Sequence, residues 1–126
     1  MYGFKKETSL SYEKAIEHVK EKLKNEGFGV LTEIDVKATF KKKLDVDFDK
    51  YVILGACNPQ FAYQALQAET DIGLLLPCNV IVYEKDNKTV ISIIKPSVAM
   101  QMVENSDLEK VAGEVDEKLE RVINQC

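Results

Sequence analysis

The amino-acid sequence predicts an α+β fold: a two-layer sandwich in which a five-stranded, largely antiparallel sheet packs against two long helices. Five short segments have the alternating or apolar, β-branched composition of strands. Two amphipathic segments near the ends of the chain have helical periodicity and need a sheet face to cover their apolar stripes. The 126 residues, 45% of them hydrophobic and 30% charged, suit one globular domain, which we place at residues 1–126.

The chain opens with a strand and a long helix. The strand is expected at residues 2–7. Ser9 or Ser11 can cap the helix that follows, because a serine oxygen accepts the free N–H groups of the first turn. Gly27 ends this helix, since glycine readily takes the left-handed conformation that a helix end requires. The apolar stripe of the helix consists of Tyr12, Ala15, Ile16, Val19 and Leu23.

Two strands and two short helices are predicted in the middle of the chain. Residues 28–36 alternate as a strand does, and Asp35 can cap a short helix that follows. Residues 51–57 form a third strand. Asn58 followed by Pro59 predicts a helix that continues to about residue 69, because asparagine is a favoured cap and proline suits the first helical position. The inward face of this helix consists of Phe61, Ala62, Ala65 and Leu66.

The last third of the chain reads as a hairpin and a long helix. Residues 79–85 and 89–95 pair around turn residues 86–88, and Pro96 ends the second strand. Ser106–Glu109 has the sequence of a capping box and opens the last helix. The apolar stripe of that helix consists of Leu108, Val111, Ala112, Val115, Leu119, Val122 and Ile123.

The sheet is predicted to need cover on both faces. Residues 51–57, 79–83 and 90–94 are apolar at consecutive positions, which is typical of strands buried on both sides. The two long helices suffice for one face. The two short helices could cover part of the other face, and a second subunit the rest, so we expect a homodimer.

The charge and hydropathy of the chain exclude several partners. The net charge is −4 and the isoelectric point about 5.1, which predicts no binding to nucleic acid or to an anionic membrane. The longest uncharged segment, residues 72–83, is too short to span a bilayer. The first residues lack the apolar core of a signal peptide, so we expect a cytoplasmic protein.

Few residues are candidates for chemistry. The chain has three cysteines and one histidine, without a CxxC or a zinc-ligand spacing, so no metal site and no structural disulfide are predicted. No hydrolase, phosphate-binding or dinucleotide motif is present, so no catalytic residue and no cofactor are assigned. Cys126 ends the chain and is expected to be frayed and exposed.

Two cysteine segments resemble one another, GACNP around Cys57 and LPCNV around Cys78, and each cysteine precedes an asparagine, Asn58 or Asn79. If the two strands are antiparallel neighbours, the end of one lies beside the start of the other, so the cysteines lie close together. The helix that starts at Asn58 would favour a Cys57 thiolate. The alternative is that both cysteines are small buried core residues.

Three stretches carry a family resemblance: EGFGVLTEIDVKATFKKKLDVDF, YVILGACNPQFAYQAL and GLLLPCNVIVYE. Together with the strand-helix opening and hairpin-helix close, they make the chain similar to the domain of unknown function 302 family. The resemblance implies an α+β fold of the TATA-box-binding-protein-like type, with the order strand, helix, four strands, helix, and a tendency to form homodimers. It implies no reaction.

Two functions remain open. One is a small-ligand or thiol-dependent binding module with Cys57, Asn58, Cys78 and Asn79 at one pocket rim, where asparagine amides can donate and accept hydrogen bonds. The thiols could then hold a soft metal or an oxidised intermediate. The other is a structural or interaction protein that forms a homodimer, with the cysteines in the core. Accessibility of the two sulfur atoms separates these hypotheses.

Overall fold

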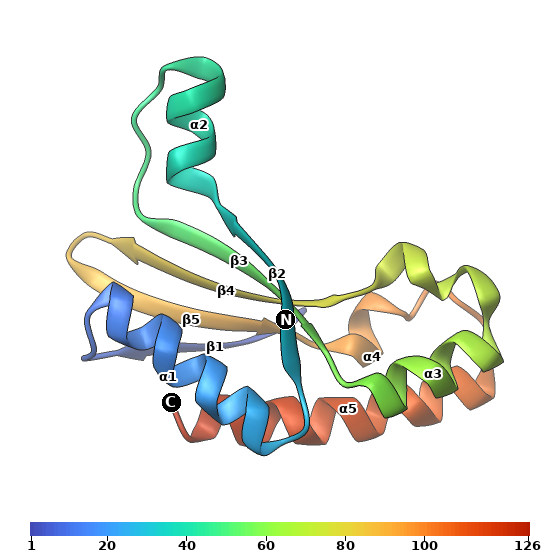
Figure 1. Cartoon of the computed structure of the whole chain (residues 1–126). Helices are drawn as coiled ribbons and strands as arrows, with labels where there is room; N and C mark the ends of the chain where they lie inside the picture. Colours follow the sequence, from blue (N-terminus) through green and yellow to red (C-terminus); the bar gives the residue numbers. More distant parts are fainter.

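The computed structural model describes residues 1–126 and has an antiparallel sheet of five strands in the order β1-β5-β4-β3-β2 (Figure 1). The strands are β1 (Gly3–Thr8), β2 (Gly29–Asp35), β3 (Tyr51–Cys57), β4 (Cys78–Lys85) and β5 (Lys88–Ile94). The helices are α1 (Tyr12–Asn25), α2 (Val36–Leu44), α3 (Pro59–Ala68), the 3₁₀ helix η1 (Thr70–Leu75), α4 (Pro96–Ala99) and α5 (Ser106–Asn124). The predicted α+β class and element order are confirmed.

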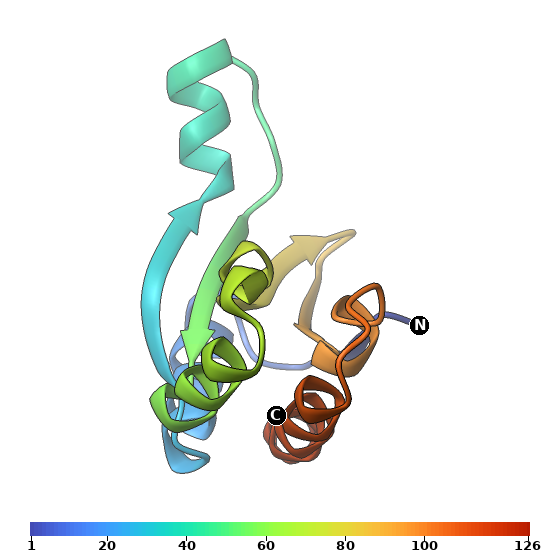
Figure 2. The same cartoon turned by 90° about the vertical axis from the view of Figure 1, so that its right-hand side faces the viewer.

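The core lies between the sheet and the two long helices, α1 and α5, which cover the same face (Figure 2). Alternate strand residues point toward these helices, so cross-strand partners such as Leu54 and Val80 are both completely buried. The apolar stripe of α1 contributes Val19 and Leu23, also completely buried. Each such side chain stabilises the fold by roughly 1.5–3 kcal/mol through removal of apolar surface from water.

The predicted ends of α1 and α2 are confirmed. Ser11 rather than Ser9 caps α1, since its Oγ accepts a hydrogen bond of 3.3 Å from the N–H of Lys14. Gly27 follows α1 with a φ of 86°, the left-handed conformation that favours glycine. Asp35 caps α2 by accepting from the N–H of Ala38 at 2.9 Å.

α5 begins at Ser106 as predicted, but the residue that caps it is Asn105 and not Ser106. Asn105 is the cap, because its backbone is extended and its Oδ1 accepts from the N–H groups of Asp107 (3.0 Å) and Leu108 (3.1 Å). Ser106 is already the first helical residue. The amide Nδ2 of Asn105 donates to the carbonyl of Ala68 at 2.7 Å and so ties α5 to the end of α3. A capping box is a local sequence pattern, so it does not include this contact between residues 37 positions apart.

The short helices do not cover the second face of the sheet, contrary to the prediction. α2 extends away from the sheet and has no buried residue, while α3 packs beside α5 beyond the end of the sheet (Figures 1 and 2). The sheet residues opposite the core side therefore have no helical layer over them in this chain and are only partly buried. We call this surface the open face; its apolar and aromatic residues are Ile34, Tyr51, Ile53, Ile81, Tyr83, Val90 and Ile94.

Helix length and composition bear on membrane insertion. The longest helix, α5, has 19 residues, of which Asp, Glu, Lys and Arg occupy the face turned away from the core. No helix in the structure combines the length and the apolar character that crossing a bilayer requires.

Gly55 is required by close packing at the end of β3. A Cβ at this position would collide with Thr32 Oγ1 of β2 and lie 2.7 Å from Cγ of Pro77. We expect Gly55→Ala to lower the free energy of unfolding by roughly 1–3 kcal/mol, the usual cost of overpacking. Gly29→Ala in β2 is the matched control, because nothing lies within 4 Å of its added Cβ. Urea denaturation that finds equal stability for both variants would contradict this packing.

Candidate functional site

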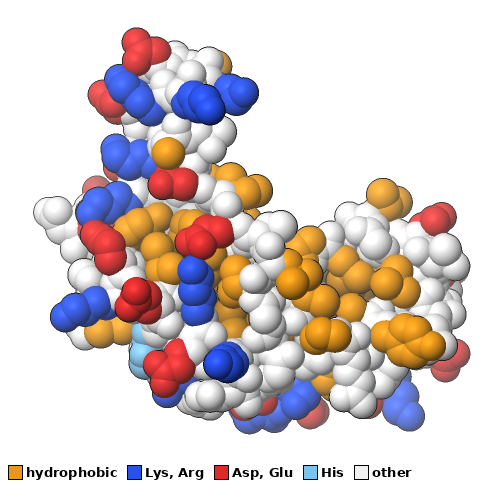
Figure 3. All heavy atoms as spheres, in the orientation of Figure 1, with side chains coloured by type: hydrophobic (Ala, Val, Ile, Leu, Met, Phe, Trp, Pro, Cys, Tyr) orange, Lys and Arg blue, Asp and Glu red, His pale blue; other side chains and the backbone are white.

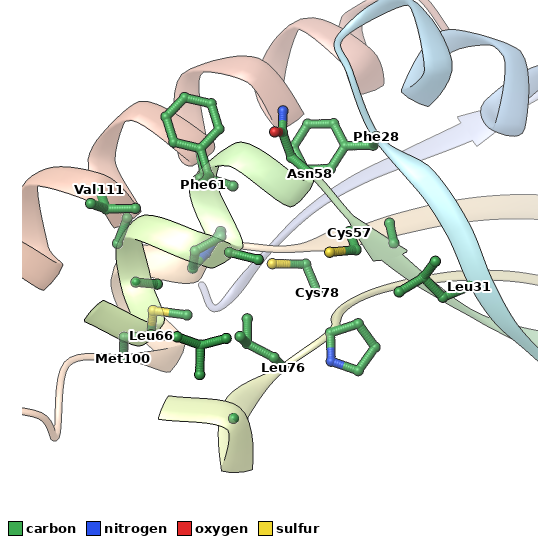
Figure 4. A pocket seen from close by; sticks show the side chains of 18 residues that line it. Phe28, Leu31, Cys57, Asn58, Phe61, Leu66, Leu76, Cys78, Met100 and Val111 are labelled. Atoms are coloured by element: carbon green, nitrogen blue, oxygen red, sulfur yellow. The ribbon is translucent and has the colours of Figure 1, made fainter. Parts of the chain in front are cut away.

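An apolar cavity of about 330 Å³ lies where β3 ends and β4 begins (Figure 4). Its walls come from β2, β3 and β4, from α3, η1, α4 and α5, and from the segments that precede β2 and β4. Of its 18 lining residues, 14 are hydrophobic. Four of these residues are alanines, namely Ala56, Ala62, Ala65 and Ala112. Close packing leaves few voids in ordinary cores. Short side chains on α3, α5 and β3 keep this space open.

The cavity separates two clusters of buried side chains. The main cluster lies between the sheet and α1 and α5, and includes Ala56 and Val115. The smaller cluster holds α3, η1 and the start of α5 together, and includes Ala65, Met100 and Ala112. All five of these residues also line the cavity. The cavity is therefore a space between two packed units and has walls that tertiary packing holds in place.

Cys57 and Cys78 lie side by side at this edge of the sheet, with both side chains directed into the cavity (Figure 4). The antiparallel register of β3 and β4 accounts for their proximity, because Cys78 pairs with Ala56, the residue before Cys57. Both are free thiols. Cys126 does not join them and is not frayed: it is half-buried, and its Sγ donates to the carbonyl of Val122 at 3.2 Å.

Burial controls the chemistry of Cys78. Loss of solvent raises the pKa of its thiol to about 11, with smaller contributions from the neighbouring Cys57 and from Asp116. Near neutral pH the side chain is therefore a neutral thiol, whereas soft metals and nucleophilic reactions require the thiolate. No group of three or more histidine, cysteine, aspartate or glutamate side chains is arranged to hold a metal ion.

Asn58 occupies the cap position of α3 but does not cap it, so the predicted hydrogen bond is wrong. Its Nδ2 donates instead to the carbonyl of Glu26 at 3.3 Å, just after α1. The left-handed turn at Gly27 leaves room for this amide, which lies 3.0 Å from where a Cβ of Gly27 would be. Asn58 thus joins α1 to the start of α3 and also lines the cavity.

Asn79 lies away from the cavity. It follows Cys78 in β4, and because strand side chains alternate, it points to the other face of the sheet, where it is exposed opposite Gly55. The structure thus brings Cys57, Asn58 and Cys78 together and leaves Asn79 out. No local sequence signal places Met100, just after α4, or Val111 of α5 at this site, because only the fold brings them near the cysteines.

Comparisons with known proteins agree on one family. The protein-family model described as "Domain of unknown function DUF302" matches residues 4–126. The crystal structure of an uncharacterised conserved DUF302 protein from Bacillus stearothermophilus is similar to this chain, with a TM-score of 0.94 and 32% sequence identity. That alignment covers 100% of this chain and 98% of the other. No curated protein matches the sequence.

Substitution of Asn58 tests whether its side chain acts as a hydrogen-bond donor to Glu26 or as the cap of α3. Asn58→Asp should lower the free energy of unfolding by roughly 1–3 kcal/mol, because a carboxylate that cannot donate then faces the Glu26 carbonyl. A cap would accept aspartate as readily as asparagine. Asp35→Asn, at the true cap of α2, is the control and should change stability little. Chemical denaturation of the two variants gives the comparison; an unchanged Asn58→Asp protein would refute the donor role.

The thiol of Cys78 should react slowly. Because the pKa of this thiol is about 11, the thiolate fraction at pH 8 is on the order of one in a thousand. The rate of iodoacetamide labelling should therefore rise about tenfold for each pH unit between pH 8 and the pKa. Cys57, beside the start of α3, stays the cysteine that we predict reacts first. Residue-resolved mass spectrometry measures both rates, with denatured protein as control. Equal rates for Cys78 in native and denatured protein at pH 8 would contradict its burial.

Proposed function

The chain belongs to the DUF302 family, and we propose that it binds a small, predominantly apolar molecule in the cavity between β3, α3 and α5. The observation that carries this proposal is the cavity itself, with its volume of about 330 Å³ and its hydrophobic lining. Sites for small molecules occupy roughly 300–1,000 Å³ and are lined mainly by apolar side chains. The volume suits a compact ligand.

The walls indicate the chemistry of the ligand. Phe28, Phe61, Leu66, Met100 and Val111 present aromatic rings and aliphatic groups (Figure 4), and no lining residue is charged. A hydrocarbon chain or an aromatic ring gains free energy by leaving water for such a space. An ionised group would lose its hydration there without a partner. We therefore propose a ligand that is neutral within the cavity.

Three side chains supply polar contacts. The Oδ1 of Asn58 accepts no hydrogen bond within the chain, so it is free to accept one from a ligand hydroxyl or amide. Cys57 and Cys78 provide weak S–H donors on polarizable walls. The neutral state of Cys78 favours this role over metal binding or redox chemistry. These few polar side chains on an apolar wall suit an apolar ligand that carries one polar group.

Filling the cavity should weaken binding. We expect the neutral fluorescent probe N-phenyl-1-naphthylamine to bind the native protein saturably, and Ala62→Phe, which places a ring in the cavity, to weaken binding by at least about tenfold. Gln60→Phe adds the same ring to an exposed position on α3 and is the control. Fluorescence titration gives both affinities, and thermal melting confirms folding. Absence of saturable binding, or equal affinities for the two variants, would refute the proposal.

A further inference from the structure

We propose that Cys57 and Cys78 together form a covalent site for a neutral trivalent arsenical that carries an apolar organic group. The organic group occupies the cavity, so the inference rests on the proposed binding of apolar molecules there and names one class of them. Three features of the cavity support it: two thiols meet at one edge, the thiol of Cys78 keeps its proton, and the approach from solvent is apolar.

Two thiols from neighbouring strands meet at the cavity. Cys78 opens β4 opposite Ala56, the residue before Cys57, so strand pairing holds the two cysteine backbones close together. Both side chains are directed into the cavity (Figure 4), and both are free thiols. The third cysteine, Cys126, does not line the cavity, and its Sγ donates to the carbonyl of Val122. A ligand atom at this edge therefore meets two thiols at once.

Trivalent arsenic is an atom that bonds to two thiols. In an organoarsenous acid, the arsenic carries one carbon and two hydroxyl groups. When both cysteines react, two As–O bonds break and two As–S bonds form, and each thiol proton leaves with a hydroxyl group as water. Arsenic stays trivalent and neither sulfur is oxidised, so the reaction requires no oxidant and no reductant.

The electrostatics of the cavity favour this ligand over a metal cation. Burial raises the pKa of the Cys78 thiol to about 11, so the thiol is protonated near neutral pH. A soft cation requires the thiolate, and its charge would lose hydration among walls that hold no charged residue. The arsenical, the thiols, the adduct and the released water are all neutral. No charge therefore has to enter the apolar space.

The approach to the cavity suits an apolar substituent on arsenic. Leu31 and Leu66 line the cavity, yet their exposed fractions are 69% and 43%, so they mark its mouth. Hydrophobic side chains gather on the surface over α3 and η1, whereas charged ones cluster on α2 (Figure 3). An aryl or alkyl group gains free energy when it leaves water for such walls, a gain that inorganic arsenite lacks.

Phenylarsine oxide is the probe, because it brings one phenyl ring and an arsenic atom that binds two thiols. The native full chain, treated with one equivalent, should retain the phenylarsenic group in excess glutathione, a monothiol that displaces arsenic held by one cysteine. Digestion with trypsin and then with a protease that cuts after glutamate separates Cys57 from Cys78 at Glu69. Mass spectrometry should find the two resulting peptides joined through arsenic.

Loss of either cysteine tests whether both thiols take part. Cys57→Ser and Cys78→Ser should each release the phenylarsenic group at a glutathione concentration at least about a hundredfold lower, because the second As–S bond forms within the chain. Cys126→Ser is the matched control and should release it as the native protein does. Cys57→Ala and Cys78→Ala repeat the test without a buried hydroxyl, and thermal melting confirms that each variant folds.

Arsenite, which has no organic group, tests whether the phenyl ring occupies the cavity. The protein should prefer phenylarsine oxide over arsenite at least about tenfold more strongly than free dithiothreitol does, because only the protein removes the ring from water. A preference equal to that of dithiothreitol would place the ring outside the cavity and contradict the proposed site.

Two further results would overturn the site. One is a native adduct that glutathione removes as readily as it does from Cys57→Ser and Cys78→Ser, and the other is a bridge that includes Cys126. Saturable binding of N-phenyl-1-naphthylamine without an arsenic bridge would refute the arsenical site alone. A bridge between Cys57 and Cys78 in a protein that binds no naphthylamine probe would count against the proposed function alone.

Discussion

The packing of α1 and α5 on the same face of the sheet is the constraint on which the rest of the structure depends. These two helices complete one apolar layer, in which Val19, Leu54 and Leu119 are fully buried. The connections cannot enter that layer, so α3 packs on α5 past the sheet end and α2 extends outward. The cavity and the open face are both consequences of this arrangement.

At the cavity, the same constraint explains why Cys78 is a neutral wall residue. The β3–β4 register places Cys78 beside Ala56, and α3 then closes over this edge of the sheet. Removal of water raises the pKa of the Cys78 thiol, which opposes thiolate chemistry. An apolar space with one amide at its margin has the character of the binding site proposed above.

The order of strands and helices could be predicted from the sequence because periodicity, Gly27 and Pro59 are local signals. The proximity of Cys57 and Cys78 followed from antiparallel pairing of neighbouring strands. Other features depend on partners far along the chain. The side-chain amide of Asn58 donates to the carbonyl of Glu26, 32 residues away, and that of Asn105 donates to the carbonyl of Ala68, 37 residues away. The cavity needs α4 and α5 against α3, a juxtaposition that no local pattern encodes.

Apolar molecules are proposed to enter the cavity and not the open face, and nuclear Overhauser effects from bound N-phenyl-1-naphthylamine test this most directly. We expect contacts between the probe's ring protons and the methyl groups of Leu66, Met100 and Val111, which line the cavity. Contacts confined to the methyl groups of Ile34, Ile53 and Ile81, which lie on the open face, would contradict it.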